Sequence, residues 1–150
     1  MLLSNACVYG MRAAVYLASV SNDSYTSITQ ISDDLDISRH FLTKVLQELT
    51  KAGLLESMKG PKGGVRLAYS GDEIHLLEIV AAIDGMDILT ECALGLPGCG
   101  SEKPCPIHDK WADTRDEIRK MLSESSLKDL VDRGKEGDLR ITADGNFNWA

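Results

Sequence analysis

The sequence predicts a mainly α-helical protein of 150 residues: a winged helix-turn-helix with a small β-hairpin wing and an appended long helix. Three observations lead to this prediction. Apolar residues in the first third of the chain recur at helical spacing behind serine caps. A short hairpin rich in glycine and lysine follows them. A longer amphipathic helix then comes after a loop rich in Gly, Pro and Cys.

Three helices are expected in the first third of the chain. The first covers about residues 6–20, where apolar side chains repeat every three to four positions. Ser27 can cap a short second helix that ends at Leu35, and Ser38 can cap a third helix that ends before Gly53. Two helices joined by a turn of about three or four residues are typical of a helix-turn-helix.

The predicted wing follows directly. Residues 54–58 and 65–67 alternate in hydrophobicity like two short strands. Glycines in the loop between them permit a positive φ, and Lys59 and Lys62 are expected to reach outward from a tip that Pro61 stiffens. We therefore expect residues 1–85 to form a winged helix-turn-helix DNA-binding domain.

A second unit is predicted for residues 86–131, which would form a cysteine loop and a dimerisation helix. A fourth helix, over residues 76–83, precedes it. The long helix, about residues 107–122, carries an apolar stripe on one face, and appended amphipathic helices of this kind commonly pair with a twin. The sequence thus predicts a homodimer.

The C-terminal end looks less ordered. Ser126 can cap a last short helix through Leu127, Leu130 and Val131, after which Gly and Asp residues become frequent. We expect residues 132–150 to form a flexible tail, with Phe147 and Trp149 as candidate docking groups.

Composition narrows the class of protein. A hydrophobic fraction of 43% and a charged fraction of 26% are typical of a soluble globular domain. We find neither a membrane span nor a signal peptide, and so expect a cytoplasmic protein without membrane association. No catalytic triad or phosphate loop is recognisable, so we expect neither an enzyme nor a small-molecule substrate.

The charge distribution favours DNA as the partner. The chain carries a formal net charge of −7, yet residues 38–67 hold six basic and two acidic residues. A basic face on an acidic body suits binding to an operator in double-stranded DNA, although a protein-interaction winged helix is an alternative. The candidate DNA-binding residues are Ser38, Arg39, His40, Thr43, Lys44, Lys59, Pro61 and Lys62. Third-helix side chains would meet base edges, and the wing lysines would meet phosphates.

A candidate metal site lies in the loop before the long helix. Its potential ligands are Cys92, Cys99, Cys105 and His108. In a reducing compartment, clustered cysteines are more often ligands or redox sensors than structural disulfides. Their spacing differs from that of zinc fingers, so an iron–sulfur cluster, zinc and a redox disulfide all remain open on spacing alone. Cys7, inside the first helix, is interpreted as a buried small hydrophobe, and His75 as a helix cap.

Several segments together resemble the winged-helix regulators of the IscR, NsrR and RirA type, bacterial dimeric sensors of iron–sulfur status, nitric oxide, iron or redox stress. They are Tyr9-x-x-Arg12, the run from Asp36 to Leu55, the wing from Lys59 to Leu67, Ile83-Asp84-Gly85, and the loop ending Pro104-Cys105-Pro106-Ile107-His108. The resemblance spans about residues 9–130.

This resemblance implies that Cys92, Cys99 and Cys105 hold a 2Fe-2S or 4Fe-4S cluster, with zinc as the alternative. IscR-like members use a histidine shortly after the last cysteine as the fourth ligand, which corresponds to His108. NsrR-like members use an acidic residue that corresponds to Val8, and valine cannot bind a metal.

Two departures from the family pattern concern the signal and the target. The first cysteine interval holds six residues where IscR-like members have five, and Thr43 stands where they carry a glutamate. The sensed signal and the target sequence therefore need not be those of IscR-like members.

Together, the motifs and the resemblance predict a dimeric transcriptional regulator, a repressor, that is gated by an iron–sulfur cluster. A cluster-free thiol switch and a zinc-stapled interaction module are the alternatives.

Overall fold

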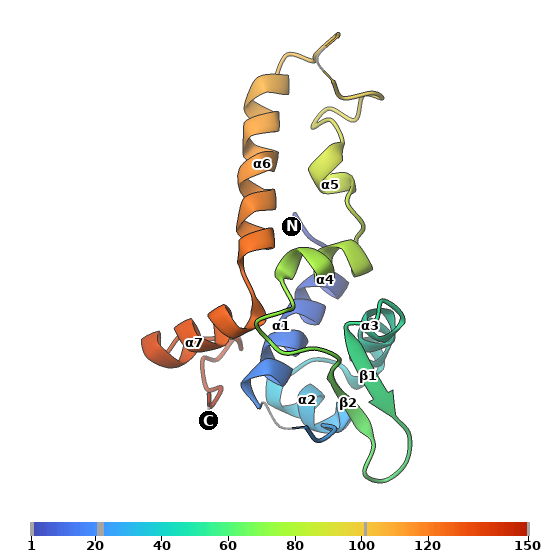
Figure 1. The fold of residues 1–150 in the computed structure, drawn as a ribbon, viewed down its shortest axis with the longest axis vertical. Helices are drawn as coiled ribbons and strands as arrows, with labels where there is room; N and C mark the ends of the chain where they lie inside the picture. Colours follow the sequence, from blue (N-terminus) through green and yellow to red (C-terminus); the bar gives the residue numbers. More distant parts are fainter. Residues whose placement is uncertain (1, 21–22, 101, 150) are drawn as a thin grey trace.

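The computed structural model describes residues 2–20, 23–100 and 102–149. Residues 1, 21–22, 101 and 150, which fall within the predicted domain ranges, lie outside the described residues. In chain order the elements are α1 (Asn5–Ser19), α2 (Ile28–Leu35), α3 (Arg39–Lys51), β1 (Leu55–Met58), β2 (Gly64–Leu67), α4 (Leu76–Ile83), α5 (Asp87–Thr90), α6 (His108–Glu124) and α7 (Leu127–Gly137). The predicted fold class, a helical winged helix with a long appended helix, is confirmed (Figure 1).

Helix α1 is the centre of the molecule and packs against α3, α4 and α7. Ser4 caps its N-terminus, because the Ser4 hydroxyl accepts a hydrogen bond from the backbone N–H of Cys7 at 3.0 Å. Tyr16 and Cys7 are almost completely buried along its length. Cys7 is therefore a core residue, as its helical position predicted.

The helix-turn-helix forms from α2 and α3. Ser27 caps α2 by accepting a hydrogen bond from the N–H of Gln30 at 3.1 Å. Asp36 ends this helix in the left-handed conformation, with φ of 53°. Ser38 occupies the N-cap position of α3, as predicted, but its side chain makes no capping hydrogen bond. Its hydroxyl is therefore exposed ahead of the third helix.

The wing is an antiparallel hairpin of β1 and β2, in which Leu55 pairs with Leu67 and Met58 with Gly64. Val65 also forms an isolated bridge with Thr26, in the segment before α2. Gly64 allows this contact, because its φ is +151° and a Cβ there would collide with the carbonyl oxygen of Thr26. The wing is thus joined directly to the helix-turn-helix.

Arg66 fixes the base of the wing. Its Nε contacts the Glu56 carboxylate at 2.8 Å and its Nη1 donates to the carbonyl of Asp23 at 2.7 Å. The guanidinium also lies 4.4 Å from the centre of the Tyr25 ring. The Arg66 side chain therefore joins both strands to the segment between α1 and α2. The hairpin is fixed at its base, and its tip, residues 59–62, is exposed.

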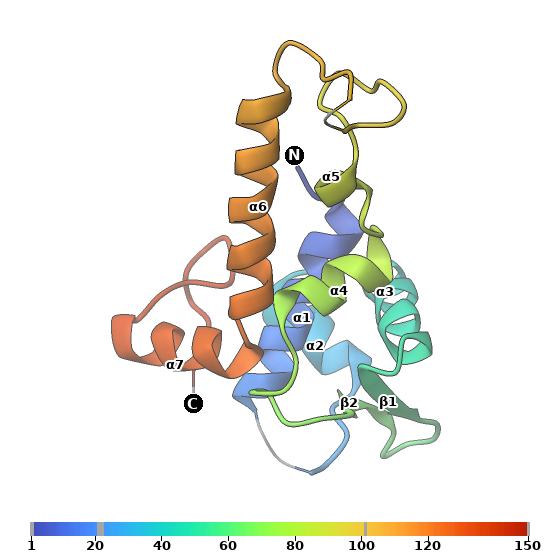
Figure 2. The same cartoon turned by 45° about the horizontal axis from the view of Figure 1, so that its top comes forward.

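Helix α6 stands out from the rest of the molecule, with α5 beside its far half and the cysteine loop at its far end (Figures 1 and 2). Its near end is tied to α4, since the N–H of Leu76 donates to the carbonyl of Ser125 at 3.0 Å and the N–H of Leu127 to that of Ile74 at 2.9 Å. His75 caps α4, as predicted. In the described part of the chain, no helix is both long and apolar enough to cross a membrane.

The C-terminal segment differs from the expectation of a flexible tail. Helix α7 continues to Gly137, beyond the predicted boundary at residue 131. Phe147 lies 5.6 Å from the ring of Tyr16 and 5.2 Å from that of Trp149, measured between ring centres. The two aromatic residues therefore hold the segment against α1 and α7, because burying their rings removes a large apolar area from water.

Candidate functional site

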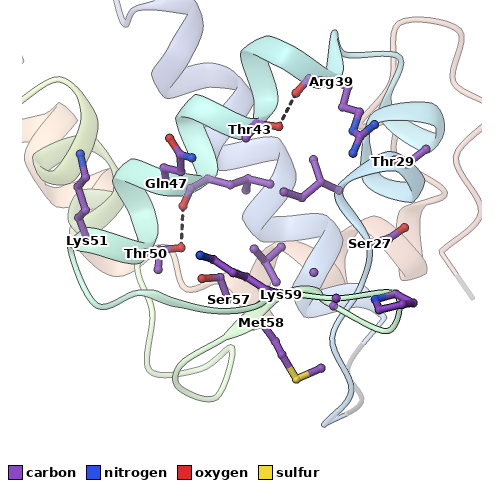
Figure 3. Close-up of a pocket in the computed structure, with 17 residues that line it drawn as sticks. Ser27, Thr29, Arg39, Thr43, Gln47, Thr50, Lys51, Ser57, Met58 and Lys59 are labelled. Atoms are coloured by element: carbon purple, nitrogen blue, oxygen red, sulfur yellow. Dashed lines mark hydrogen bonds between the residues drawn. The ribbon is translucent and has the colours of Figure 1, made fainter.

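A groove lies between α3 and the wing (Figure 3). Its volume is about 500 Å³, and its walls come from the start of α2, one face of α3 and the strands and tip of the hairpin. Figure 3 shows Arg39, Thr43 and Gln47 along α3, opposite Ser57 and Lys59 of the wing. The groove is thus bordered by cationic and hydrogen-bonding side chains from separate elements.

Four of the eight candidate DNA-binding residues line this groove: Arg39, Thr43, Lys59 and Pro61. The other four, Ser38, His40, Lys44 and Lys62, are exposed outside it. Helical geometry explains the division, since residues four apart share one face of a helix. Arg39 and Thr43 form one row of α3, and His40 and Lys44 form the next. The two rows lie side by side, with Arg39, His40 and Lys44 exposed and Thr43 half-buried.

Thr43 differs from its neighbours in being half-buried. Its hydroxyl donates to the carbonyl of Arg39 at 2.8 Å, one turn back along the helix. This bond fixes the Thr43 rotamer, so the methyl group and the oxygen lone pairs have a set direction. A fixed methyl group can contact the methyl of a thymine base.

Six polar residues of the groove were not among the candidates from the sequence: Ser27, Thr29, Gln47, Thr50, Lys51 and Ser57. Gln47 had a usable signal, because it follows Thr43 by four positions on the same helical row. Thr29 had none, since it reaches the groove only through the packing of α2 against α3. Gln47 carries both donors and an acceptor and can pair with a base edge.

The candidate metal ligands converge at the far end of α6. The Sγ atoms of Cys92 and Cys105 are 3.5 Å apart, and the Sγ of Cys99 lies 3.4 Å from Nδ1 of His108. The four groups thus form two close pairs. Over residues 2–20, 23–100 and 102–149, no three Cys, His, Asp or Glu side chains are arranged to hold a single metal ion.

The surroundings of the loop shift the pKa values of the Cys92 and Cys105 thiols in opposite directions. Backbone N–H groups of Leu96 and Leu94 stabilise the thiolate of Cys92 and lower its pKa. For Cys105, the N–H of Ile107 acts in the same direction, but burial and the nearby Cys92 and Cys99 sulfurs outweigh it, and the pKa is raised. Cys92 is therefore the more readily ionised member of its pair.

Helix α6 holds the loop through carbonyl oxygens. Nε1 of Trp111 and Nη1 of Arg115 both donate to the carbonyl of Glu91, at 2.8 and 3.1 Å. Nη1 of Arg115 also lies 3.6 Å from Sγ of Cys99, and Nη2 of Arg119 donates to the carbonyl of Leu89 at 2.8 Å. These bonds join α5, whose Leu89 is buried, and the segment before Cys92 to α6.

The donor set fits an iron–sulfur cluster. Three thiols lie on one loop and an imidazole on the first residue of α6, and backbone N–H groups already point at two of the sulfurs. N–H···S hydrogen bonds of this kind stabilise cluster-bound thiolates and tune their potential.

Together, the winged helix and its long appended helix define a DNA-binding transcriptional regulator. Comparison with known proteins supports this class: a family profile described as Rrf2, iron-dependent transcriptional regulator, matches residues 3–133. The chain belongs to the Rrf2 family. Because this is a family of DNA-binding regulators, the expectation that the protein is not an enzyme is confirmed.

Individual relatives point the same way. The transcriptional regulator IscR of Photorhabdus laumondii is 33% identical over 139 residues, covering 93% of this chain and 84% of its own length. The solved structure of IscR from T. potens superposes with a TM-score of 0.73 at 22% identity, over 91% of this chain and 90% of that one. The solved structure of the oxidized form of Staphylococcus aureus CymR superposes with a TM-score of 0.68 at 27% identity, over 87% of this chain and 95% of that one.

Proposed function

We propose that this protein is a homodimeric, cytoplasmic repressor whose affinity for operator DNA is gated by an iron–sulfur cluster in the loop from Cys92 to His108. The strongest support is that the wing and the loop before α6 lie at opposite ends of the molecule (Figure 1). A groove with cationic side chains borders the wing, and paired thiols lie in the loop. Further support comes from the family model that matches this chain, which is described as an iron-dependent transcriptional regulator, and from the IscR relatives.

The reading surface is the exposed face of α3 together with the wing. The first turns of α3 would enter the major groove with Arg39, His40 and Thr43 near base edges. Lys59 and Lys62 at the wing tip would contact phosphates or the adjacent minor groove. A dimer would place two such helices about one helical turn apart on a palindromic site.

Helix α6 is the proposed dimer element. The near end of its apolar stripe is already used within the chain, because Leu122 is buried and Ile118 packs beside it, against Cys7 and Val80. Ile107 and Met121 remain 42% and 56% exposed. Since the main contacts of α6 are with α4 and α5, a second copy can cover these exposed groups.

Cys92, Cys99, Cys105 and His108 are the residues that would hold the cluster. When bound, such a cluster supplies a site that oxidants, nitric oxide or iron scarcity can alter. Arg115 would place its guanidinium beside the Cys99 thiolate, and the N–H groups of Leu94 and Leu96 would stay on Cys92.

A continuous set of contacts runs from the loop toward α3. Arg119 and Arg115 tie the segment around α5 to α6, and the near end of α6 is hydrogen-bonded to the start of α4. Helix α4 in turn packs against both α1 and α3. Ordering the loop can therefore bias the position of α3 through packed elements, with a coupling of about 1–3 kcal/mol, typical of allosteric proteins.

The reading surface can be tested with Lys62→Ala and Thr43→Ala. An operator is first selected from random-sequence DNA, and fluorescence anisotropy then gives affinities over a range of salt concentrations. Lys62→Ala should weaken binding to all sequences and reduce the salt slope by about 1. Thr43→Ala should change which operator is preferred. Equal losses on specific and random DNA for both variants would contradict these roles.

The metal site can be tested with Cys99→Ala. This variant should lose the visible absorption of the anaerobically purified protein yet remain a folded dimer, since the core lies elsewhere. Circular dichroism and sedimentation measure the fold and the dimer. A variant that unfolds would instead indicate a structural zinc site.

A thiol switch is the second candidate, favoured by the 3.5 Å separation of the Cys92 and Cys105 sulfurs. The thiolate of Cys92 would attack hydrogen peroxide, breaking the O–O bond to form a sulfenic acid and release hydroxide. The thiol of Cys105 would then attack that sulfur and release water as the disulfide forms. This candidate predicts a colourless protein whose operator affinity changes with peroxide and is restored by a thiol reductant. A cluster protein would be coloured, with iron and sulfide bound.

A further inference from the structure

A second cavity lies on the opposite side of α1 from the groove, between α1, α7 and the C-terminal segment. Its volume is about 660 Å³, which falls in the range of small-molecule sites. Most of its lining is apolar. The apolar walls come chiefly from Met11, Val15, Leu76, Leu130, Ile141 and Trp149.

The walls of this cavity are held by specific contacts. The indole of Trp149 lies directly on Gly134 of α7, where any Cβ would collide with the ring. Its Nε1 also donates to the carbonyl of Leu139 at 2.6 Å. From the other side, Nε of Arg12 donates to the carbonyl of Ile141 at 2.8 Å. The segment from Leu139 to Trp149 is therefore fixed as a wall.

The charge of the lining is unusual for this chain. Although the formal net charge is −7, three arginines and no acidic residue line the cavity. Arg12 is committed to carbonyls, since its Nη2 also donates to that of Leu35 at 2.9 Å. Arg133 and Arg140 are exposed, and neither forms an ion pair with any of the described residues. Nη1 of Arg140 donates to the carbonyl of Ala143 at 3.3 Å, which leaves its other N–H groups for a ligand.

We propose that this cavity binds a small molecule that carries a carboxylate on an apolar body. The apolar walls would take the body out of water. The planar guanidiniums of Arg133 and Arg140 would receive the carboxylate, for which their donor geometry is well suited. This binding site is separate from the proposed cluster site and from the proposed operator-binding surface. Arg12 connects the cavity wall at Ile141 to Leu35, the last residue of α2.

Octanoate and octan-1-ol provide the test, because they share an apolar body and differ in charge. Equilibrium dialysis of the full chain with each radiolabelled compound, without DNA, measures binding directly. We expect one saturable octanoate site per chain, with affinity at least about tenfold higher than for octan-1-ol, since hydrogen bonds to a charged group are the strong ones. Equal affinities, or no saturable octanoate binding, would overturn the proposal.

Two sets of variants locate the site. The double variant Arg133→Met and Arg140→Met should weaken octanoate binding about tenfold and leave octan-1-ol unchanged, because only the charged contact is removed. Its control, Lys120→Met with Lys135→Met, removes the same charge from exposed positions outside the cavity and should change neither. Gly134→Ala should displace Trp149 and weaken both ligands. Octanoate affinity that is unchanged in the arginine variant, or lost equally in the lysine control, would refute the assignment.

Discussion

The two ends of the molecule are built in different ways. At the wing end, α3 contributes Leu42, Leu46 and Leu49 to the core, each at most 1% exposed. At the other end, the described residues from Ala93 to Ile107 are all exposed or half-buried. The segment just before that loop is joined to α6 by hydrogen bonds to the carbonyls of Leu89 and Glu91. The reading surface is therefore preformed on a packed core. The cysteine loop has little such packing, so a group bound there would order it.

The largest expected effect is at Gly64. Gly64→Ala would force a Cβ against the carbonyl of Thr26 at a φ of +151°, so the bridge to the wing must open. We expect a loss of about 2–4 kcal/mol in the free energy of unfolding, the range of combined backbone strain and overpacking. Urea denaturation measures this, and operator binding should fall with it.

Gly98→Ala is the matched change in the cysteine loop. Gly98 also has a positive φ, +69°, but no atom lies within 4 Å of the added Cβ. Its cost should be only that of the left-handed conformation, about 1 kcal/mol. Equal losses for the two glycines would remove the contrast between the preformed and the loosely held end.

Cys7, in the core, provides a second comparison with the three cysteines of the loop. Cys7 is completely buried, and burial, with a smaller contribution from Asp84, raises its pKa to about 12. Because the folded state keeps this proton, stability should be constant below the ordinary thiol pKa of about 8.5 and fall above it. The slope from this residue is about 1.4 kcal/mol per pH unit. Denaturant unfolding between pH 8 and 10.5 measures it.

Cys7→Ala is the control for this titration. The variant loses packing at neutral pH but has no thiol to ionise, so its deficit relative to the natural chain should shrink as the pH rises past 9. Tyr16, whose pKa is also raised to about 12 by burial and Asp34, titrates equally in both proteins. Parallel stability curves would mean that Cys7 ionises freely.

The smallest expected effect is at Arg115. Arg115→Met keeps the aliphatic stem but removes the donor to the Glu91 carbonyl and to Cys99. Loss of these partly exposed hydrogen bonds should cost about 1 kcal/mol or less globally. It should also raise the rate at which iodoacetamide modifies Cys99 in the metal-free protein. Lys120→Met, an exposed change in the same helix, should leave that rate unchanged.

Local signals were enough to predict much of the fold. Apolar spacing and serine caps predicted α1, α2 and α3 to within a few residues, and alternation around the glycine-rich loop predicted the wing. His75 and Ser126 were predicted as caps, and the structure shows both in that role. These features depend only on neighbouring residues, which is why a single sequence reveals them.

Features set by distant contacts could not be predicted. Helix α5 has only four residues and no periodicity, and its position depends on Arg119 of α6. The docking of Trp149 requires the bare surface of Gly134, and nothing in the spacing of the two residues indicates it. In the candidate site, the pairing of Cys92 with Cys105 and of Cys99 with His108 likewise depends on how the loop folds back.

One measurement tests the central claim directly. The protein is purified anaerobically, its iron and sulfide are counted, and operator affinity is measured before and after the metal is removed by a chelator. We predict visible absorption, comparable amounts of iron and sulfide, and an affinity change of about 5- to 150-fold, the range of ordinary allosteric coupling. A colourless protein that reconstitution with iron and sulfide leaves unchanged, or one whose operator affinity is the same with and without metal, would contradict the account.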